Sequence, residues 1–206
     1  MFKFKNFFLV PVMFFLIFSQ PYAYESRVSL SAGIFYPNSE DLDGWDEGTD
    51  ITVSLSKRVS QSFYLHFDLS GHSTQAELYD TGLTGSGEIQ TRGIEVIGIF
   101  SHQNNKLELY AGIGLGIYMN KLSLTATDGY YEYTYEDAGR GTGGVLKAGM
   151  RYSISPKAFI GTFIKFFTNN QDFQFYEIDS YGNVTKYEET FDFGGTVVNV
   201  EFGLTF

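Results

Sequence analysis

Val197-Val198-Asn199-Val200-Glu201-Phe202-Gly203-Leu204-Thr205-Phe206 are the last ten residues of the chain, and from Val198 onward they alternate between apolar side chains and other types. One face of this stretch carries Val198, Val200, Phe202, Leu204 and Phe206. A period of two over this length predicts a β-strand. A soluble domain rarely places an aromatic ring at a strand end that frays in water. The stretch therefore favours a strand whose apolar face meets lipid.

The composition agrees with a membrane barrel. The chain has 206 residues, enough for one domain, and 43% of them are hydrophobic. Aromatic residues make up 18%, with 21 Phe and 15 Tyr, and there are 23 Gly but only 4 Pro. Transmembrane barrels have this mixture because half of each strand is apolar, half is polar or small, and aromatic residues ring both interfaces.

Charge and cysteine usage exclude several functions. The formal net charge is −10, which argues against nucleic acid as a partner. Cysteine is absent, so disulfide scaffolds, thiolate metal sites and a cysteine nucleophile are excluded. We expect no cofactor and no resident metal.

The N-terminus is predicted to be a secretory signal peptide. Lys3 and Lys5 precede an apolar run over residues 7–18, and cleavage is expected after Ala23. The run is shorter than the ~20 residues that a spanning helix needs. No later stretch is long and apolar enough to replace it. The expected organisation is a signal peptide over residues 1–23 and one domain over residues 24–206.

The remaining chain shows eight alternating segments, which predict strands. They cover residues 27–36, 50–58, 62–71, 89–100, 107–118, 143–154, 158–168 and 197–206. Short connections (57–61, 101–106, 153–157) alternate with long ones (37–49, 72–88, 120–142, 169–195). This alternation is typical of the periplasmic turns and extracellular loops of an outer-membrane barrel. We therefore predict an all-β, eight-stranded antiparallel up-and-down transmembrane barrel.

A soluble barrel of lipocalin type is the alternative fold, and it would turn the apolar face inward. The segment 107–118 tests this choice, because its other face carries Gly112, Gly114 and Gly116. Three alternate glycines suit a crowded interior better than a solvated surface. The apolar face is therefore expected to point outward.

If the apolar face points outward, a set of charged side chains on the other face points into the lumen. The predicted lumen network comprises His66, Asp68, Glu95, Glu108, Lys147, Arg151, Lys165 and Glu201. An eight-stranded barrel is only wide enough for side chains to fill it, and an unpaired buried ion costs several kcal/mol. The network is thus expected to form a paired plug, with a narrow or gated pathway as the alternative.

Two stretches resemble the OmpA/OmpX/OmpW-like family of small outer-membrane barrels. Residues 144–160 resemble the penultimate hairpin of that family, and residues 110–116 resemble its central glycine-rich strand. The resemblance implies that Phe202, Leu204 and Phe206 form the signal read by the barrel assembly machinery. It also implies a monomer in the Gram-negative outer membrane, with membrane lipids and lipopolysaccharide as partners. Family members include structural barrels, adhesins, small-molecule channels and lipid A-modifying enzymes.

The first long connection is acidic and weakly suggests a cation site. Asp41, Asp43, Asp46 and Glu47 lie close together in sequence, and hard cations prefer several carboxylate oxygens in a tight turn. The glycine and glutamate positions do not match an EF-hand loop. A solvated acidic loop is the simpler interpretation.

Aromatic and acidic residues also alternate in the third and fourth long connections. Residues 130–136, 173–176 and 187–191 are expected to continue strands above the membrane, joined at residues 180–183 in the fourth. Exposed aromatic side chains give a binding surface area at low entropic cost. Packing of the extended hairpins on each other is the alternative.

The leading functional hypothesis is a non-enzymatic structural or surface-interaction barrel. The alternative is a narrow OmpW-like channel for small or apolar solutes. A weaker third hypothesis is a lipid A-modifying enzyme, for which His72 and Ser73 at the outer mouth, oriented by Asp80, would supply the chemistry.

Overall fold

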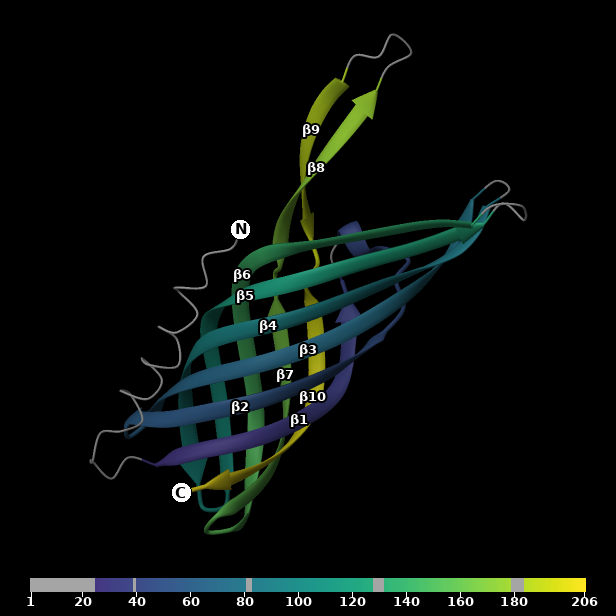
Figure 1. Ribbon diagram of the computed structural model, residues 1–206. Coiled ribbons are helices and arrows are strands. Elements are labelled where there is room, and N and C mark those ends of the chain that lie inside the picture. Colours follow the sequence, from purple (N-terminus) through teal and green to yellow (C-terminus); the bar gives the residue numbers. More distant parts are fainter. Residues whose placement is uncertain (1–24, 39, 81–82, 128–131, 179–183) are drawn as a thin grey trace.

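The computed structural model describes residues 25–38, 40–80, 83–127, 132–178 and 184–206 (Figure 1). The expected signal peptide over residues 1–23 lies outside the described residues. Within these ranges, no helix has the length and apolar character needed to cross a membrane. The elements are β1 (Ser26–Pro37), η2 (Glu40–Leu42), β2 (Gly48–Ser60), β3 (Phe63–Asp80), β4 (Leu83–Asn104), β5 (Leu107–Thr127), β6 (Glu132–Ser155), β7 (Ala158–Phe167), β8 (Asn170–Ile178), β9 (Val184–Asp192) and β10 (Gly195–Thr205).

Eight of these strands close into a barrel. Each of β1 to β7 pairs antiparallel with its neighbour, and β10 pairs with both β7 and β1 to complete the ring (Figure 1). The predicted eight-stranded antiparallel barrel is confirmed. The remaining two strands, β8 and β9, form a hairpin that leaves the barrel between β7 and β10.

The apolar faces of the strands point outward. Leu30, Ile113 and Leu115 are 58%, 67% and 74% exposed, whereas Thr52 and Glu95 on the opposite face are fully buried. This distribution is the reverse of a soluble barrel, so the lipocalin-type alternative is wrong. On β5 the outward apolar side chains run from Leu107 to Met119. At about 3.3 Å per residue and a tilt of about 40°, this run crosses roughly 30 Å, which matches the bilayer core.

At the end of the barrel opposite the short turns, the strands are longer than the sequence predicts. A loop is expected over residues 72–88, but β3 and β4 stay paired up to Asp80 and Leu83. The prediction is wrong because both faces of the hairpin meet water beyond the membrane, which removes the apolar alternation. Over the described residues, the expected extensions are confirmed for β5 and β6, which pair up to Thr127 and Glu132, and for β8 and β9. Residues 130 and 131 of the expected extension lie outside the described residues. The joining residues 180–183 lie outside the described residues.

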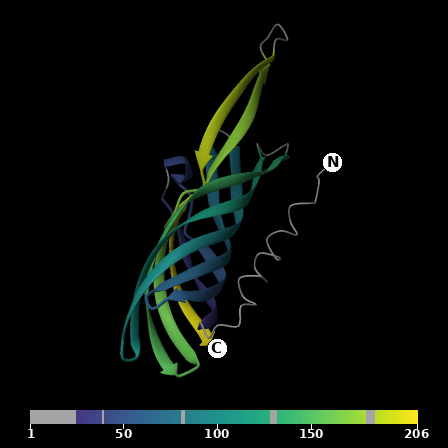
Figure 2. The ribbon, with the colours of Figure 1, turned by 90° about the vertical axis from the view of Figure 1, so that its left-hand side faces the viewer.

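These extensions form two separate projections. The long ends of β3 to β6 lean to one side of the barrel as a four-stranded sheet, while β8 and β9 rise as a twisted hairpin (Figures 1 and 2). Both projections stand at the end of the barrel opposite the short turns. The strand pairing therefore continues well beyond the apolar belt at this end of the barrel.

Glycines relieve crowding inside the barrel. A side chain at Gly116 would collide with the hydroxyl of Tyr118, and one at Gly203 would collide with the ring of Phe159. The predicted crowded interior of the glycine-rich strand is therefore present, and aromatic rings from neighbouring positions fill the space that the glycines leave.

Candidate functional site

The structure places all eight predicted lumen residues inside the barrel. Each has its charged or polar group buried, and together they come from β3, β4, β5, β6, β7 and β10. They form a series of ion pairs that follow one another along the lumen rather than one cluster.

The pair nearest the short-turn end joins Arg27 and Glu108. One guanidinium nitrogen of Arg27 lies 2.6 Å from the Glu108 carboxylate, and another donates to the Tyr64 hydroxyl at 2.9 Å. Arg27 also binds Glu25. Arg27 is not among the predicted lumen residues, although its position next to the outward-facing Val28 is a signal for an inward side chain.

The second pair joins Arg151 and Glu201. The Arg151 Nε atom donates to Glu201 at 2.8 Å, and the Tyr110 hydroxyl donates to the same carboxylate at 3.1 Å. The Arg151 guanidinium also lies over the Tyr110 ring at 4.2 Å. Arg151 and Glu201 are both predicted lumen residues, but the sequence does not identify them as partners.

The third group is a triad around Asp68. Lys147 Nζ lies 2.7 Å from Asp68 Oδ2, and His66 Nε2 lies 2.8 Å from Asp68 Oδ1. The Ser54 hydroxyl donates to the same carboxylate at 2.5 Å. The ammonium of Lys147 also lies 4.0 Å from the centre of the Phe163 ring. Every charge in this group has a partner although all three side chains are fully buried.

The fourth pair joins Lys165 and Glu95. Lys165 Nζ lies 2.9 Å and 3.2 Å from the two oxygens of Glu95. The hydroxyls of Ser70 and Tyr118 also donate to this carboxylate, at 3.2 Å and 3.4 Å. The pair thus receives the additional hydrogen bonds that a buried carboxylate needs.

An aromatic layer lies beyond these ion pairs. The His72 ring is 4.3 Å from the Phe35 ring and 5.1 Å from the Phe167 ring, and Phe167 is 5.3 Å from Tyr118. His72 Nδ1 is 3.9 Å from Asp50, beyond hydrogen-bonding distance. The sequence does not indicate this layer, because its members lie far apart in the chain.

An amide layer follows the aromatic one. Asn120 donates to Gln171 at 2.8 Å and exchanges hydrogen bonds with Asn169, while Thr91 donates to Asn120 at 2.8 Å. Three of these four residues fall in connections that are expected to be loops. They cannot be recognised as lumen residues until the strands are known to continue.

The proposed enzyme residues do not come together. His72 and Ser73 are consecutive in β3, so their side chains point to opposite faces of the strand. His72 is buried in the lumen, whereas Ser73 is half-buried on the outer face. The two side chains are not arranged as a nucleophile and its base, which must be within hydrogen-bonding reach.

The acidic loop forms hydrogen bonds with residues from other parts of the chain. The Asp41 carboxylate accepts a hydrogen bond from the backbone of Asp192 at 2.7 Å, and the backbone of Asp46 donates to Gln75 at 2.8 Å. Across the part of the chain that the structure describes, no group of three or more His, Cys, Asp or Glu side chains is arranged to hold a metal ion. Asp43 and Glu47 therefore join no such group.

Solved structures share this architecture. No family model and no curated protein matches the sequence. The outer membrane protein OprG from Pseudomonas aeruginosa has a TM-score of 0.62 at 13% identity, over 89% of this chain and 96% of that chain. A major outer membrane protein from Thermus thermophilus has a TM-score of 0.51 at 16% identity, over 90% of this chain and the whole of that chain. The chain thus shares the fold of these outer-membrane β-barrels, and its outward-facing apolar belt agrees with that architecture.

Proposed function

We propose that this protein is a non-enzymatic, non-conducting outer-membrane barrel with a structural or surface-interaction role. The observation that carries the proposal is the filling of the lumen by consecutive layers of paired side chains. Lys147, Arg151 and Lys165 each bind a carboxylate, so none of these three cations is left to attract an anion into a path. The aromatic layer of Phe35, His72 and Phe167 adds a steric barrier.

The extracellular projections support the surface-interaction part of the proposal. On β6, Tyr135 is 48% exposed, and its hydroxyl donates to Asp137 at 3.3 Å. Partial burial and the nearby Asp137 carboxylate raise the pKa of the Tyr135 phenol, so the group remains a neutral hydrogen-bond donor. Rigid strands that carry such side chains offer an ordered surface to a partner.

Conductance in a planar bilayer tests the proposal. The refolded protein should give no discrete current steps, and Glu201→Gln should leave the barrel silent because the neighbouring layers still close it. A variant carrying Phe35→Ala and Phe167→Ala opens the aromatic layer and serves as the comparison. Discrete steps in the wild-type protein that change with Glu201→Gln would overturn the proposal and favour the narrow OmpW-like channel.

The non-enzymatic part needs its own test. Lipid A from cells that express the protein should have the same mass as lipid A from cells that express His72→Ala. A mass change that depends on His72 would overturn this part and revive the lipid A-modifying hypothesis.

A further inference from the structure

The basic residues of this acidic chain are unevenly distributed. Within the described residues, four face the lumen (Arg27, Lys147, Arg151, Lys165) and four lie near the short-turn end (Lys57, Arg58, Lys106, Lys157). Lys186 lies in the β8–β9 hairpin. The remaining three are Arg92, Lys121 and Arg140, which are all exposed on the outer face of β4, β5 and β6.

These three residues are neighbours in the sheet. Arg92 and Arg140 both pair with Met119, one from each side, so they lie roughly 10 Å apart across β5. Lys121 is two residues further along β5 and points to the same face. A depression of about 590 Å³ lies among them, with Met119 and Ala138 in its lining. We call Arg92, Lys121 and Arg140 the basic row.

The basic row lies where the apolar belt ends. Met119 is the last outward apolar side chain of the belt on β5, and Ile117 lies directly below it. Within the row, Lys121 Nζ lies 3.1 Å from Glu136, and both side chains are about half exposed. An ion pair with this exposure contributes little free energy, so another anion can replace Glu136 as the partner of Lys121. The row thus offers positive charge at the height of lipid headgroups.

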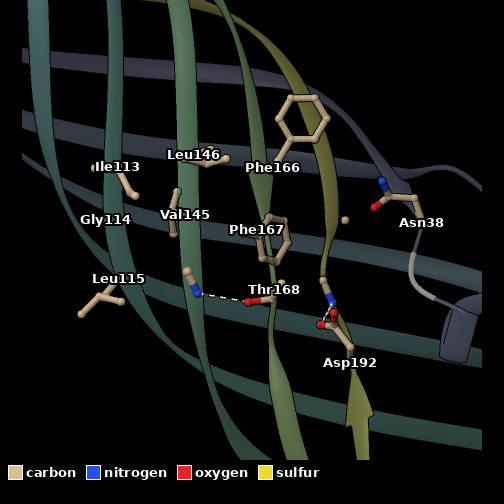
Figure 3. A pocket seen from close by; sticks show the side chains of 13 residues that line it. Asn38, Ile113, Gly114, Leu115, Val145, Leu146, Phe166, Phe167, Thr168 and Asp192 are labelled. Atoms are coloured by element: carbon tan, nitrogen blue, oxygen red, sulfur yellow. Dashed lines mark hydrogen bonds between the residues drawn. The ribbon is translucent and has the colours of Figure 1, made fainter.

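An apolar groove lies beneath the basic row on the same wall. Its volume is about 740 Å³, and its lining includes the outward-facing apolar side chains of Ile113, Leu115, Leu146 and Phe166 (Figure 3). Gly144 lies among them, and the polar residues Asn38, Thr168 and Asp192 line another part of the groove. A Cβ atom placed on Gly144 would meet nothing within 4 Å, so the missing side chain leaves open space. Because Ile113, Leu115, Leu146 and Phe166 face the bilayer core, the part of the groove that they line at Gly144 needs an apolar occupant.

The groove and the basic row face the same way. Arg140 and Gly144 are four residues apart on β6, an even number, so both point outward. The separation along the strand is about 13 Å. A molecule with a phosphorylated headgroup and acyl chains can therefore reach both features at once.

We propose that the outer wall of β4, β5 and β6 binds one molecule of lipid A, with phosphate on the basic row and an acyl chain in the groove at Gly144. Charge complementarity supports this occupant, because the row gathers cations in a chain whose net charge is −10. The row spans three strands, which suits a wide phosphorylated sugar headgroup better than the single phosphate of a glycerophospholipid. The proposal rests on the membrane placement of the barrel and not on its proposed surface role.

Native mass spectrometry of the protein refolded in detergent tests the proposal. The probes are hexa-acylated lipid A with both phosphates, the same lipid without phosphate, and phosphatidylglycerol. We expect one lipid A molecule per barrel. The double variant Arg92→Gln with Arg140→Gln should bind it about tenfold more weakly, because two charge-assisted hydrogen-bond donors are lost. A matched control, Lys106→Gln with Lys157→Gln, removes two charges at the opposite end and should bind normally.

The groove has its own pair of variants. Gly144→Leu fills the open space and should weaken lipid A binding severalfold, whereas Ala32→Leu on the outer face of the distant β1 should not. Heat-modifiable migration on gels verifies that each variant is folded. Equal binding by all variants, or equal binding of the dephosphorylated lipid, would overturn the proposal. Equal binding of phosphatidylglycerol would also overturn it, because it would show a general anionic-lipid site.

Discussion

Lys147 and Lys121 lie on neighbouring strands and both form ion pairs, yet their surroundings differ completely. Lys147 and Asp68 are 2.7 Å apart with both side chains fully buried. Lys121 and Glu136 are 3.1 Å apart with 48% and 58% of their side chains exposed. The inner pair cannot exchange its partner for water, whereas the outer pair can. The comparison indicates that ion pairs in the lumen hold the barrel together, while the charge of Lys121 on the outer wall can take a new partner.

Removing one member of an inner pair should have the largest effect. Asp68→Asn keeps the shape of the side chain but leaves the Lys147 ammonium without its charge partner. We expect the free energy of unfolding to fall by about 3–5 kcal/mol. Urea unfolding from phospholipid vesicles measures this change. A loss below about 1 kcal/mol would show that water reaches Lys147, and the lumen would then not be a closed plug.

Removing both members of an inner pair should lower the free energy of unfolding by less than removing one member does. In the double variant Glu95→Leu with Lys165→Leu, no unpaired ion remains from this pair, although Ser70 and Tyr118 lose an acceptor. The double variant should unfold at a higher urea concentration than Glu95→Leu alone, with an advantage of about 2 kcal/mol or more. The single variant Lys165→Leu completes the comparison. If the losses in unfolding free energy of Glu95→Leu and Lys165→Leu add up to the loss of the double variant, the two residues do not act as a pair.

The sequence predicted which side chains face the lumen, but it did not predict which of them form ion pairs with one another. Strict alternation placed His66, Glu95 and Lys165 on the inner face because one face had to meet lipid. It did not predict that Glu201 binds Arg151, since partners across a barrel depend on the stagger between strands, which the local pattern does not encode. The amide layer was missed for a different reason, because alternation fades where both faces of a strand leave the lipid.

Substituting a glycine inside the barrel should lower the free energy of unfolding by an intermediate amount, because the interior is crowded whereas the outer wall has open space. Gly116→Ala places a methyl group against the Tyr118 hydroxyl and should lower the free energy of unfolding by about 1–3 kcal/mol. Gly144→Ala is the matched control, because its methyl group points into the open groove on the outer wall. If both substitutions change the urea midpoint equally, the interior is less tightly packed than the contacts indicate.

The smallest effect is expected for the outer pair. Lys121→Gln removes an exposed ammonium whose interaction with Glu136 is weakened by water and salt, so the free energy of unfolding should change by less than about 0.5 kcal/mol. The same urea titration used for Asp68→Asn provides the comparison on one scale. Raising the salt concentration should remove even this small difference, because mobile ions screen exposed charges. A loss as large as that of the inner pair would mean that the outer wall of β5 and β6 is structural, and Lys121 could then not exchange Glu136 for another anion.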